Sequence, residues 1–401
     1  MGNIHNATSI RQVFSFLSEE NFQLPFSDYR VHKLMTIKCI KLILASQIAN
    51  WESYEQISRE LRTSPALQES IELSSISASQ VSRRLKVLPT DVLESLFLQT
   101  VGKVKKNLPI SCDKIGPVRI VDSTSLRLPA SLANWAYLSR KSTQVKIHMR
   151  VLALPKGEII PEKAIPSTGN VSDYETGELL VENDGTIYVM DRGYVKYRQF
   201  DAWLANNVRF VNRINEKHGV WHVEKELPIP SNSFITRDAW VRLGSNFRQT
   251  ENIVRLVEFF DDQGRKYRIA TSCFDLEAVE IANIYRQRWL IELFFKWMKQ
   301  HLRLVKLYSH DPNGIWNQIF LALVAYAVAM LIQLESGTKL TMWQVLQTLR
   351  SCWYKPWSLV ESELHPKRSR TSKGRQKVPE KGVQAPKLLT SIGIIKPRKA
   401  K

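Results

Sequence analysis

One acidic side chain, Glu292, stands inside an otherwise apolar run that extends from Trp289 to Phe295. Buried carboxylates are rare unless they are paired or bind a metal, because removing a charge from water is costly. A carboxylate in such a run therefore requires a partner, and a metal ion or the cation side chains nearby would supply one. Wherever this segment packs, the carboxylate of Glu292 must therefore face a cation.

Glu292 also belongs to a longer pattern, which reads Tyr285-x2-Arg288-x3-Glu292-x6-Lys299. At 100° per residue these four positions fall within about a 60° arc of one helix face. The pattern predicts a single helix, beginning near Leu276, that presents all four side chains together.

Two further acids follow short apolar runs. Asp122 comes after residues 118–121 and Asp191 after residues 187–190, and both runs have the β-branched or aromatic composition of a buried strand. Acids at the carboxyl ends of two strands, with Glu292 on a helix, could converge on one hard cation. Mg²⁺ prefers oxygen ligands and takes few carboxylates, and two such ions about 4 Å apart can assist in-line phosphoryl displacement.

Each of these acids also has an ordinary structural explanation. A single Asp after a strand is usually a turn or helix-cap residue. Arg288 and Glu292 have the four-residue spacing of a common helix surface pair. The predicted site would be absent only if an ordinary explanation applied to each of the three acids.

The constellation resembles the DDE transposases of bacterial insertion sequences, and specifically the insertion-sequence-four family with its Tyr-Arg-Glu-Lys signature. The spacing of Tyr285, Arg288, Glu292 and Lys299 matches that signature residue for residue. The segments Val121-Asp122-Ser123-Thr124 and Met190-Asp191-Arg192-Gly193-Tyr194 are similar to the family's two Asp motifs. The similarity runs from about Val118 to Leu334.

This resemblance implies an α/β fold, with a ribonuclease-H-like mixed-sheet catalytic core interrupted by a β-rich insertion. It implies Mg²⁺-dependent cut-and-paste transposition through a DNA hairpin, in which Mn²⁺ is expected to substitute. Asp122, Asp191 and Glu292 would be the catalytic and metal-binding residues. Tyr285, Arg288 and Lys299 would contact DNA phosphates beside the scissile bond.

The composition is compatible with a nucleic-acid partner. Lys and Arg number 57 against 38 for Asp and Glu, giving a net charge of +19. A surplus of this size favours a polyanionic partner, nucleic acid first and an acidic membrane surface second, and the resemblance implies that the nucleic acid is double-stranded DNA. The cysteines form no Cys-x-x-Cys unit, which is typical of a reducing cytosol rather than a disulfide scaffold; they are Cys39, Cys112, Cys273 and Cys352.

No signal peptide is evident, and the most apolar stretch, residues 319–332, is expected to be a buried core helix. Its 14 residues are too few to span a bilayer of roughly 30 Å at 1.5 Å rise per residue. We therefore expect a cytoplasmic, nucleoid-associated protein without a membrane partner, which forms a homodimer in its DNA complex.

The chain divides into three expected regions. Residues 1–110 read as an all-helical domain, in which Ser77 caps a helix that offers Ser79, Gln80, Arg83, Arg84 and Lys86 to a DNA groove or, equally, to solvent. Residues 115–345 form the catalytic domain, with the β-rich insertion at about 215–273. Residues 346–401 end in a basic tail, expected to be disordered.

Two features of the expected catalytic domain have a functional and an ordinary interpretation. The alternating strand that carries Lys146, His148 and Arg150 is either an exposed sheet face or a phosphate-facing edge near Asp122. Aromatic residues of the insertion are either sheet core or stacking partners for an extruded base; they are Trp221, Trp240, Phe259 and Phe260.

The leading interpretation is a transposase that binds terminal inverted repeats and catalyses strand cleavage and strand transfer with two divalent ions. A ribonuclease-H-like structure-selective nuclease would share the three acids but has less reason to carry Tyr285 and Lys299. A DNA-binding regulator derived from a transposase has no need of three intact acids. No phosphate-binding loop, serine nucleophile elbow or His-Glu-x-x-His motif supports another catalytic class.

Overall fold

The computed structural model describes residues 8–17, 28–108, 115–131, 133–139, 142–229, 231–302, 304, 307–366, 388–390 and 393–395. The chain divides into two units, the first ending at Leu364 and the second beginning at His365. In the second unit, the described residues are 365–366 and the antiparallel strands β12 (Leu388–Thr390) and β13 (Gly393–Ile395). Most of the basic tail, and Cys112, lie outside the described residues.

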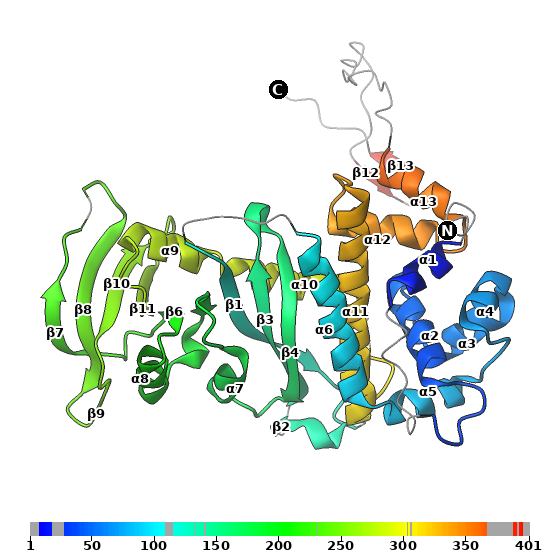
Figure 1. Ribbon diagram of the computed structural model, residues 1–401, viewed down its shortest axis with the longest axis horizontal. Helices are drawn as coiled ribbons and strands as arrows, with labels where there is room; N and C mark the ends of the chain where they lie inside the picture. The colour runs from blue at the N-terminus through cyan, green and yellow to red at the C-terminus, as the bar shows by residue number, and fades with distance from the viewer. Residues whose placement is uncertain are drawn as a thin grey trace, which may run out of the picture. The chain divides into compact units, whose positions relative to one another are not determined.

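A mixed β-sheet carries the first half of the expected catalytic region (Figure 1). Its strands run in the order β4-β3-β1-β5-β6, and β2 pairs with the start of β3. The antiparallel strands are β1 (Val118–Arg127), β2 (Tyr137–Ser139), β3 (Ser142–Ala153) and β4 (Ile159–Thr168). Two strands run parallel to β1, namely β5 (Ile187–Met190) and β6 (Arg209–Arg213). This mixed α/β architecture confirms the predicted fold class.

The β-rich insertion continues the same sheet. Strand β11 pairs antiparallel with β6, and the order then runs β11-β10-β8-β7. These strands are β7 (Val220–Glu226), β8 (Ile235–Ser245), β10 (Val254–Phe260) and β11 (Lys266–Thr271), with the short β9 (Arg248–Gln249) beside β8. Because β11 forms hydrogen bonds with β6, the insertion is joined to the strand next to the one that Asp191 follows.

Helices cover both faces of the sheet (Figure 1). Alternate residues of one strand enter different apolar clusters: Ile120 packs in one and Val121 in the other. The cluster of Val121 contains residues of α7 (Asp173–Leu180) and α8 (Tyr197–Ala205). The cluster of Ile120 contains residues of α9 (Ala278–Arg286) and α10 (Trp289–His301). The side chain of any strand residue is therefore assigned to a face by its register.

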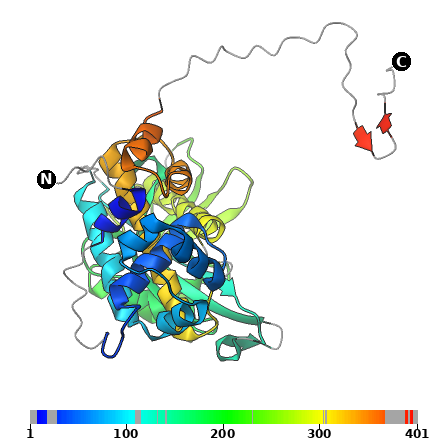
Figure 2. The same cartoon turned by 90° about the vertical axis from the view of Figure 1, so that its right-hand side faces the viewer.

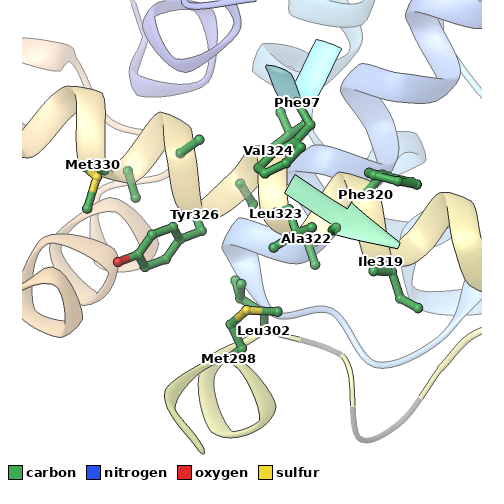
Figure 3. Close-up of a cluster of buried hydrophobic side chains, with 14 of the residues drawn as sticks. Phe97, Met298, Leu302, Ile319, Phe320, Ala322, Leu323, Val324, Tyr326 and Met330 are labelled. Carbon is green, nitrogen blue, oxygen red and sulfur yellow. The ribbon is translucent and has the colours of Figure 1, made fainter. Parts of the chain in front are cut away.

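A long buried helix, α11 (Pro312–Ser336), is central to the larger core (Figure 3). Asp311 caps its first turn, Pro312 is its first residue, and Gly337 ends it with a left-handed φ of 63°. The helix has 25 residues, so the prediction that this segment is too short to span a bilayer was wrong. It is long and apolar enough to cross a bilayer, and 94% of its apolar window is buried within the protein.

In the first 110 residues, α2, α5 and α6 pack on α11, and all six described helices contribute to its core. Figure 2 shows the molecule from the side on which α2 to α5 face the viewer. These helices are α1 (Ser9–Ser15), α2 (Thr36–Ala49), α3 (Tyr54–Thr63), α4 (Pro65–Ile71), α5 (Ala78–Val87) and α6 (Thr90–Lys106). Two more, α12 (Met342–Ser351) and α13 (Trp357–Leu364), complete the unit. The described chain thus changes from helices, the last ending at Lys106, to strands, the first beginning at Val118, within one shared core.

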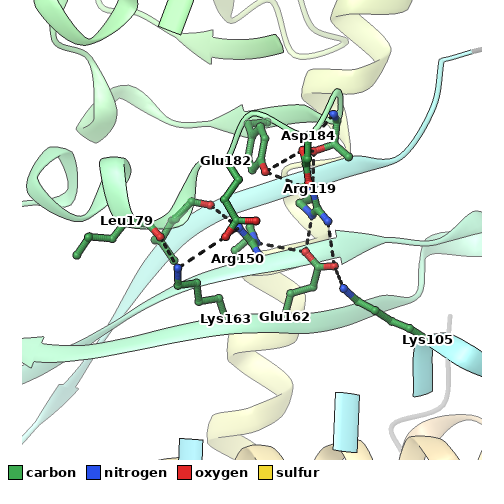
Figure 4. A network of polar contacts seen from close by, with 11 residues as sticks. Lys105, Arg119, Arg150, Glu162, Lys163, Leu179, Glu182 and Asp184 are labelled. Carbon is green, nitrogen blue, oxygen red and sulfur yellow. Dashed lines mark hydrogen bonds and ion pairs between the residues drawn. The ribbon is translucent and has the colours of Figure 1, made fainter. Parts of the chain in front are cut away.

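A buried ion-pair network also joins α6 to the sheet (Figure 4). The carboxylate of Glu162 on β4 pairs with Lys105 of α6, Arg119 of β1 and Arg150 of β3. Only 3% of Glu162 is exposed, so losing one partner would leave a buried charge undercompensated. The network supplies a polar connection between helical and strand regions in addition to the apolar core.

Candidate active site

Asp122 and Asp191 occupy adjacent positions on neighbouring parallel strands. The parallel pairing of β1 and β5 ends at Val121 and Met190, and each acid is the next residue in its strand direction. Asp191 follows the end of β5, as predicted. Asp122 does not end its strand, and that prediction was wrong: β1 continues to Arg127 because β3 still pairs with it beyond the end of β5.

Glu292 approaches these acids from α10, but the predicted single helix is divided in two. Tyr285 lies on α9, Arg288 lies in the turn that follows, and Glu292 and Lys299 lie on α10. The turn is closed by short-range backbone bonds such as Arg288 N–H to the carbonyl of Tyr285, 3.0 Å. The break has a tertiary cause, since α9 packs on β6 and β10 whereas α10 packs on β1 and β4. One straight helix cannot follow both parts of a twisted sheet.

Arg288 connects the acids. Its Nη1 lies 3.1 Å from Oδ2 of Asp122, and its Nη2 lies 2.5 Å from Oε1 of Glu292. Although burial opposes it, Tyr285 and the three carboxylates raise the pKa of Arg288 above its usual value. The guanidinium therefore provides a fixed positive charge between two acids that repel each other.

The electrostatics of Asp122 show that the three acids are close enough to interact. Burial raises the pKa of Asp122 to about 6, and the charges of Asp191 and Glu292 act in the same direction. The backbone N–H of Ser123 and the Arg288 guanidinium lower it. The pKa of this largely buried carboxylate is raised even though an arginine lies beside it, so Arg288 alone does not compensate its negative charge fully.

The other two signature residues are placed differently. The hydroxyl of Tyr285 donates to Oδ1 of Asp191 at 3.3 Å, so Tyr285 belongs to the cluster. Lys299 is half-buried two turns along α10, about 10 Å from Glu292, and burial lowers its pKa. No hydrogen bond or ion pair links Lys299 to the other signature residues, all of which the structure describes.

Beside the acids lies a pocket of about 280 Å³ between the β10–β11 hairpin and the turn at Arg288. Its aromatic lining includes Phe259, Tyr267, Tyr285 and Trp289, and Trp289 is 58% exposed. Of the four aromatic residues proposed from the sequence to stack on a base, Phe259 lines this pocket. Stacking by any of them remains a prediction.

The basic stripe of β3 is not an exposed sheet face, contrary to one of the two interpretations. His148 is fully buried and Arg150 is 7% exposed. Helix α7 covers them. Thr176 Oγ1 lies 3.0 Å from Nδ1 of His148, and the Leu180 carbonyl accepts a hydrogen bond from Arg150 Nη1. Lys146 is half-buried and pairs with an acid of α7. The positive charges of Lys146 and Arg150 are therefore used within the fold and not offered to a phosphate.

The donor set suits a hard divalent cation, since it consists of three carboxylates, one of them buried with a raised pKa. Among the described residues, no three acidic, histidine or cysteine groups are arranged to hold a metal ion. The guanidinium of Arg288 contacts both Asp122 and Glu292 in this arrangement.

A stability measurement checks the electrostatics of Asp122. Its pKa is 3.8 when exposed and about 6 in the fold, so between these values the folded state binds more protons and stability falls as pH rises. In the presence of a chelator at pH 7, Asp122→Asn is expected to raise the free energy of unfolding by about 2–3 kcal/mol. The gain should fall to a small fraction of that value at pH 4 and vanish at still lower pH, where the wild-type carboxyl is neutral in both states.

Urea unfolding at pH 7, 5 and 4 would measure this. Asp184→Asn is the control of opposite sign, because hydrogen bonds from Thr186 and Arg119 outweigh burial and lower the pKa of Asp184 to about 2. That variant should be destabilised at pH 7. A destabilised Asp122→Asn protein would show that Asp122 is satisfied by Arg288 alone.

Sequence reasoning missed residues that support the site from other elements. The Tyr285 ring rests on Tyr267 of β11, with 5.8 Å between ring centroids, and Arg213 of β6 lies over Tyr267 at 4.2 Å. Asp173 of α7 bonds Ser123, the neighbour of Asp122. No local pattern marks these residues, because their partners are distant in sequence.

Comparisons with known proteins agree with this geometry. Residues 113–328 match the family model described as the transposase DDE domain. The match begins just before β1 and ends within α11, so it contains all three acids and the insertion.

Three curated bacterial proteins are similar to the chain. A Geobacillus stearothermophilus protein, named a probable transposase for insertion sequence element IS5377, is 31% identical over 62% of this chain. A Sinorhizobium fredii protein, y4zB, also named a transposase, is 28% identical over 58% of it. A Synechocystis protein, named for insertion sequence element IS4SA, is 25% identical over 48%. The alignments span 66% of each of the first two relatives, just under two thirds, and 55% of the third.

The family model covers more than half of the chain, and the acids on β1, after β5 and on α10 all lie within it. The chain therefore belongs to the transposase DDE domain family.

Proposed function

We propose that the chain is the transposase of a bacterial insertion sequence, which binds the terminal inverted repeats and cleaves and joins DNA strands by a two-metal mechanism. The observation that carries the proposal is the meeting of Asp122, Asp191 and Glu292 around Arg288. Family membership and the names of the relatives support the same reaction class. Its place of action would be the cytoplasm, on the bacterial nucleoid.

Asp122, Asp191 and Glu292 would hold Mg²⁺, for which Mn²⁺ is expected to substitute. When bound, the ions would activate the attacking oxygen and stabilise the leaving one. The adjacent strand positions of Asp122 and Asp191 orient two carboxylates in the same direction without loop motion. Glu292 completes the set from a helix whose apolar residues pack against the sheet.

Arg288 and Tyr285 would bind the DNA phosphates beside the scissile bond. In the DNA-free protein, Arg288 compensates the charges of Asp122 and Glu292. Freed from these carboxylates, the Arg288 guanidinium would contact a phosphate oxygen through two N–H groups. Lys299, half-buried and further along α10, would contact DNA at a second position.

The test uses a donor plasmid that carries the coding sequence with its own flanking DNA, together with a supercoiled target plasmid. We expect Mg²⁺-dependent release of the element and its insertion into the target, both abolished by chelation. Cleavage of branched DNA without a requirement for the element's ends would instead indicate a nuclease. End binding without any cleavage in Mg²⁺ or Mn²⁺ would indicate a regulator.

The end-binding proposal concerns helix α5. Ser77 and Gln80 form its capping box, and Ser79, Gln80, Arg83 and Lys86 are exposed. Arg84 is not available to a groove, in contrast to the sequence-based expectation: it is 8% exposed and pairs with Asp28. The exposed side chains could read base edges while Arg84 anchors the helix.

Arg83→Ala is expected to weaken binding to the element's end and to reduce the slope of log affinity against log salt by about 1, because one phosphate contact is lost. Gel-shift titrations at several salt concentrations would measure both quantities. Lys106→Ala is the matched control, since Lys106 is an exposed cation at the end of α6. Equal effects of the two variants would contradict a specific role for α5.

A further inference from the structure

Asp173, the first residue of α7, contacts the two segments that carry the strand acids. Ser123 follows Asp122, and because strand residues alternate, Ser123 shares the α7 face with Val121 while Asp122 points to the α10 face. The Ser123 hydroxyl donates to Oδ1 of Asp173 at 2.7 Å. Asp173 thus holds β1 from the side of the sheet opposite to the three acids.

The second segment meets the same carboxylate at Gly193, two residues after Asp191. A Cβ placed on Gly193 would lie 2.8 Å from Oδ2 of Asp173 and 3.2 Å from its Cβ. A side chain at this position would require the Asp173 carboxylate to shift, because the backbone after Asp191 passes close to it. One carboxylate is therefore in contact with both strand-acid segments, at the residue after Asp122 and two residues after Asp191.

The carboxylate of Asp173 is itself held in place by β3. Lys146 Nζ lies 3.3 Å and His148 Nδ1 3.4 Å from Oδ1. His148 is fully buried, and its other ring nitrogen lies 2.9 Å from the Ser167 hydroxyl. Although burial opposes it, hydrogen bonds from His148 and Ser123 and the charge of Lys146 lower the pKa of Asp173 to about 2.

These contacts are not those of a helix cap. An acid in the first turn usually bonds the free N–H groups of its own helix. The side-chain partners of Asp173 instead belong to β1 and β3. At the start of α7, the carboxylate of Glu175 accepts from the backbone N–H of Ser172, at 3.4 Å.

We propose that Asp173 is a positioning residue of the cleavage reaction, whose carboxylate fixes Asp122 and Asp191 relative to each other through Ser123 and Gly193. The inference rests on the proposed function and deepens it by adding a residue outside the three acids. Residues that orient metal-binding carboxylates typically affect metal affinity and turnover more than they affect substrate binding.

The experiment compares Asp173→Asn and Ser123→Ala with the wild type. Asp173→Asn keeps the size of the side chain but removes its charge, and Ser123→Ala removes only the 2.7 Å hydrogen bond. For Asp173→Asn we expect a loss in kcat for end cleavage, and in Mn²⁺ affinity measured by electron paramagnetic resonance, of about 10- to 100-fold. The KM for end DNA should stay unchanged. Ser123→Ala should also lower kcat and Mn²⁺ affinity and leave KM unchanged. The double variant should have nearly the kcat and Mn²⁺ affinity of Asp173→Asn, because both substitutions remove the same contact.

Asp201→Asn is the matched control. Asp201 on α8 also joins a helix to a loop, accepting from the backbone N–H of Glu251 at 3.1 Å and of Asn252 at 2.8 Å. It should lower thermal stability without changing Mn²⁺ affinity per folded molecule.

Wild-type Mn²⁺ affinity and kcat in both Asp173→Asn and Ser123→Ala would overturn the inference. The inference would also be overturned if Asp201→Asn lost as much Mn²⁺ affinity and kcat as an Asp173→Asn protein of the same thermal stability. If the wild-type protein binds Mn²⁺ but cleaves no DNA, the proposed function fails, while the Mn²⁺ titrations still decide whether Asp173 positions the acids.

Discussion

Replacing Glu292 by glutamine is expected to reduce Mg²⁺-dependent cleavage of end-containing DNA by on the order of a thousandfold, with end affinity preserved. The amide has the shape of the carboxylate and can still accept the hydrogen bond from Arg288 Nη2. It lacks the negative charge that a divalent cation requires. Single-turnover cleavage rates and gel-shift titrations of the same preparations would separate chemistry from binding.

Glu224→Gln provides the matched control, because it makes the same change on the exposed edge strand β7, outside the acid cluster. It should cleave at the wild-type rate. Asp191→Asn should resemble Glu292→Gln, since both residues belong to the same set of acids. A Glu292→Gln protein that cleaves within about threefold of the wild type would eliminate the two-metal proposal.

Phe97→Ala is expected to lower the free energy of unfolding by about 3–5 kcal/mol. Phe97 of α6 is fully buried, and its ring lies 6.3 Å from that of Phe320 on α11 (Figure 3). Truncation removes apolar contacts and leaves a cavity between the two helices. Urea unfolding, followed both by circular dichroism and by tryptophan fluorescence, would measure the change.

The neighbouring substitution Leu98→Ala is the control, because Leu98 is 45% exposed. It should change stability by less than about 1 kcal/mol. Phe97→Ala should shift one common transition, since α6 and the catalytic sheet share a core. Two separate transitions, with only one of them shifted, would show that the helical and catalytic regions fold independently.

The same packing affects how end binding should be tested. Deleting residues 1–105 would uncover the apolar surface of α11 that α2, α5 and α6 cover. Loss of DNA binding in such a deletion would then report unfolding. Point variants on α5, with Arg84 left intact, avoid this ambiguity.

Much of the fold could be predicted from local patterns. The runs before Asp122 and Asp191 form strands, and the β-rich block and the helix capped by Ser77 lie where the sequence predicted them. Such patterns work because alternation and 3.6-residue periodicity record which side of an element is buried. They do not record the element against which that side packs.

The candidate site shows the same division. The sequence alone determined which acids are unusual, because a carboxylate among apolar residues needs a partner wherever the chain folds. Only the tertiary structure decided that Asp122 lies within a strand, that the signature divides between α9 and α10, and that Arg288 stands between two of the acids. Asp173 is the clearest case: its contacts join residues 50 and 20 positions away, and a pairing of that kind is determined by the register and packing of the sheet, which no local pattern specifies.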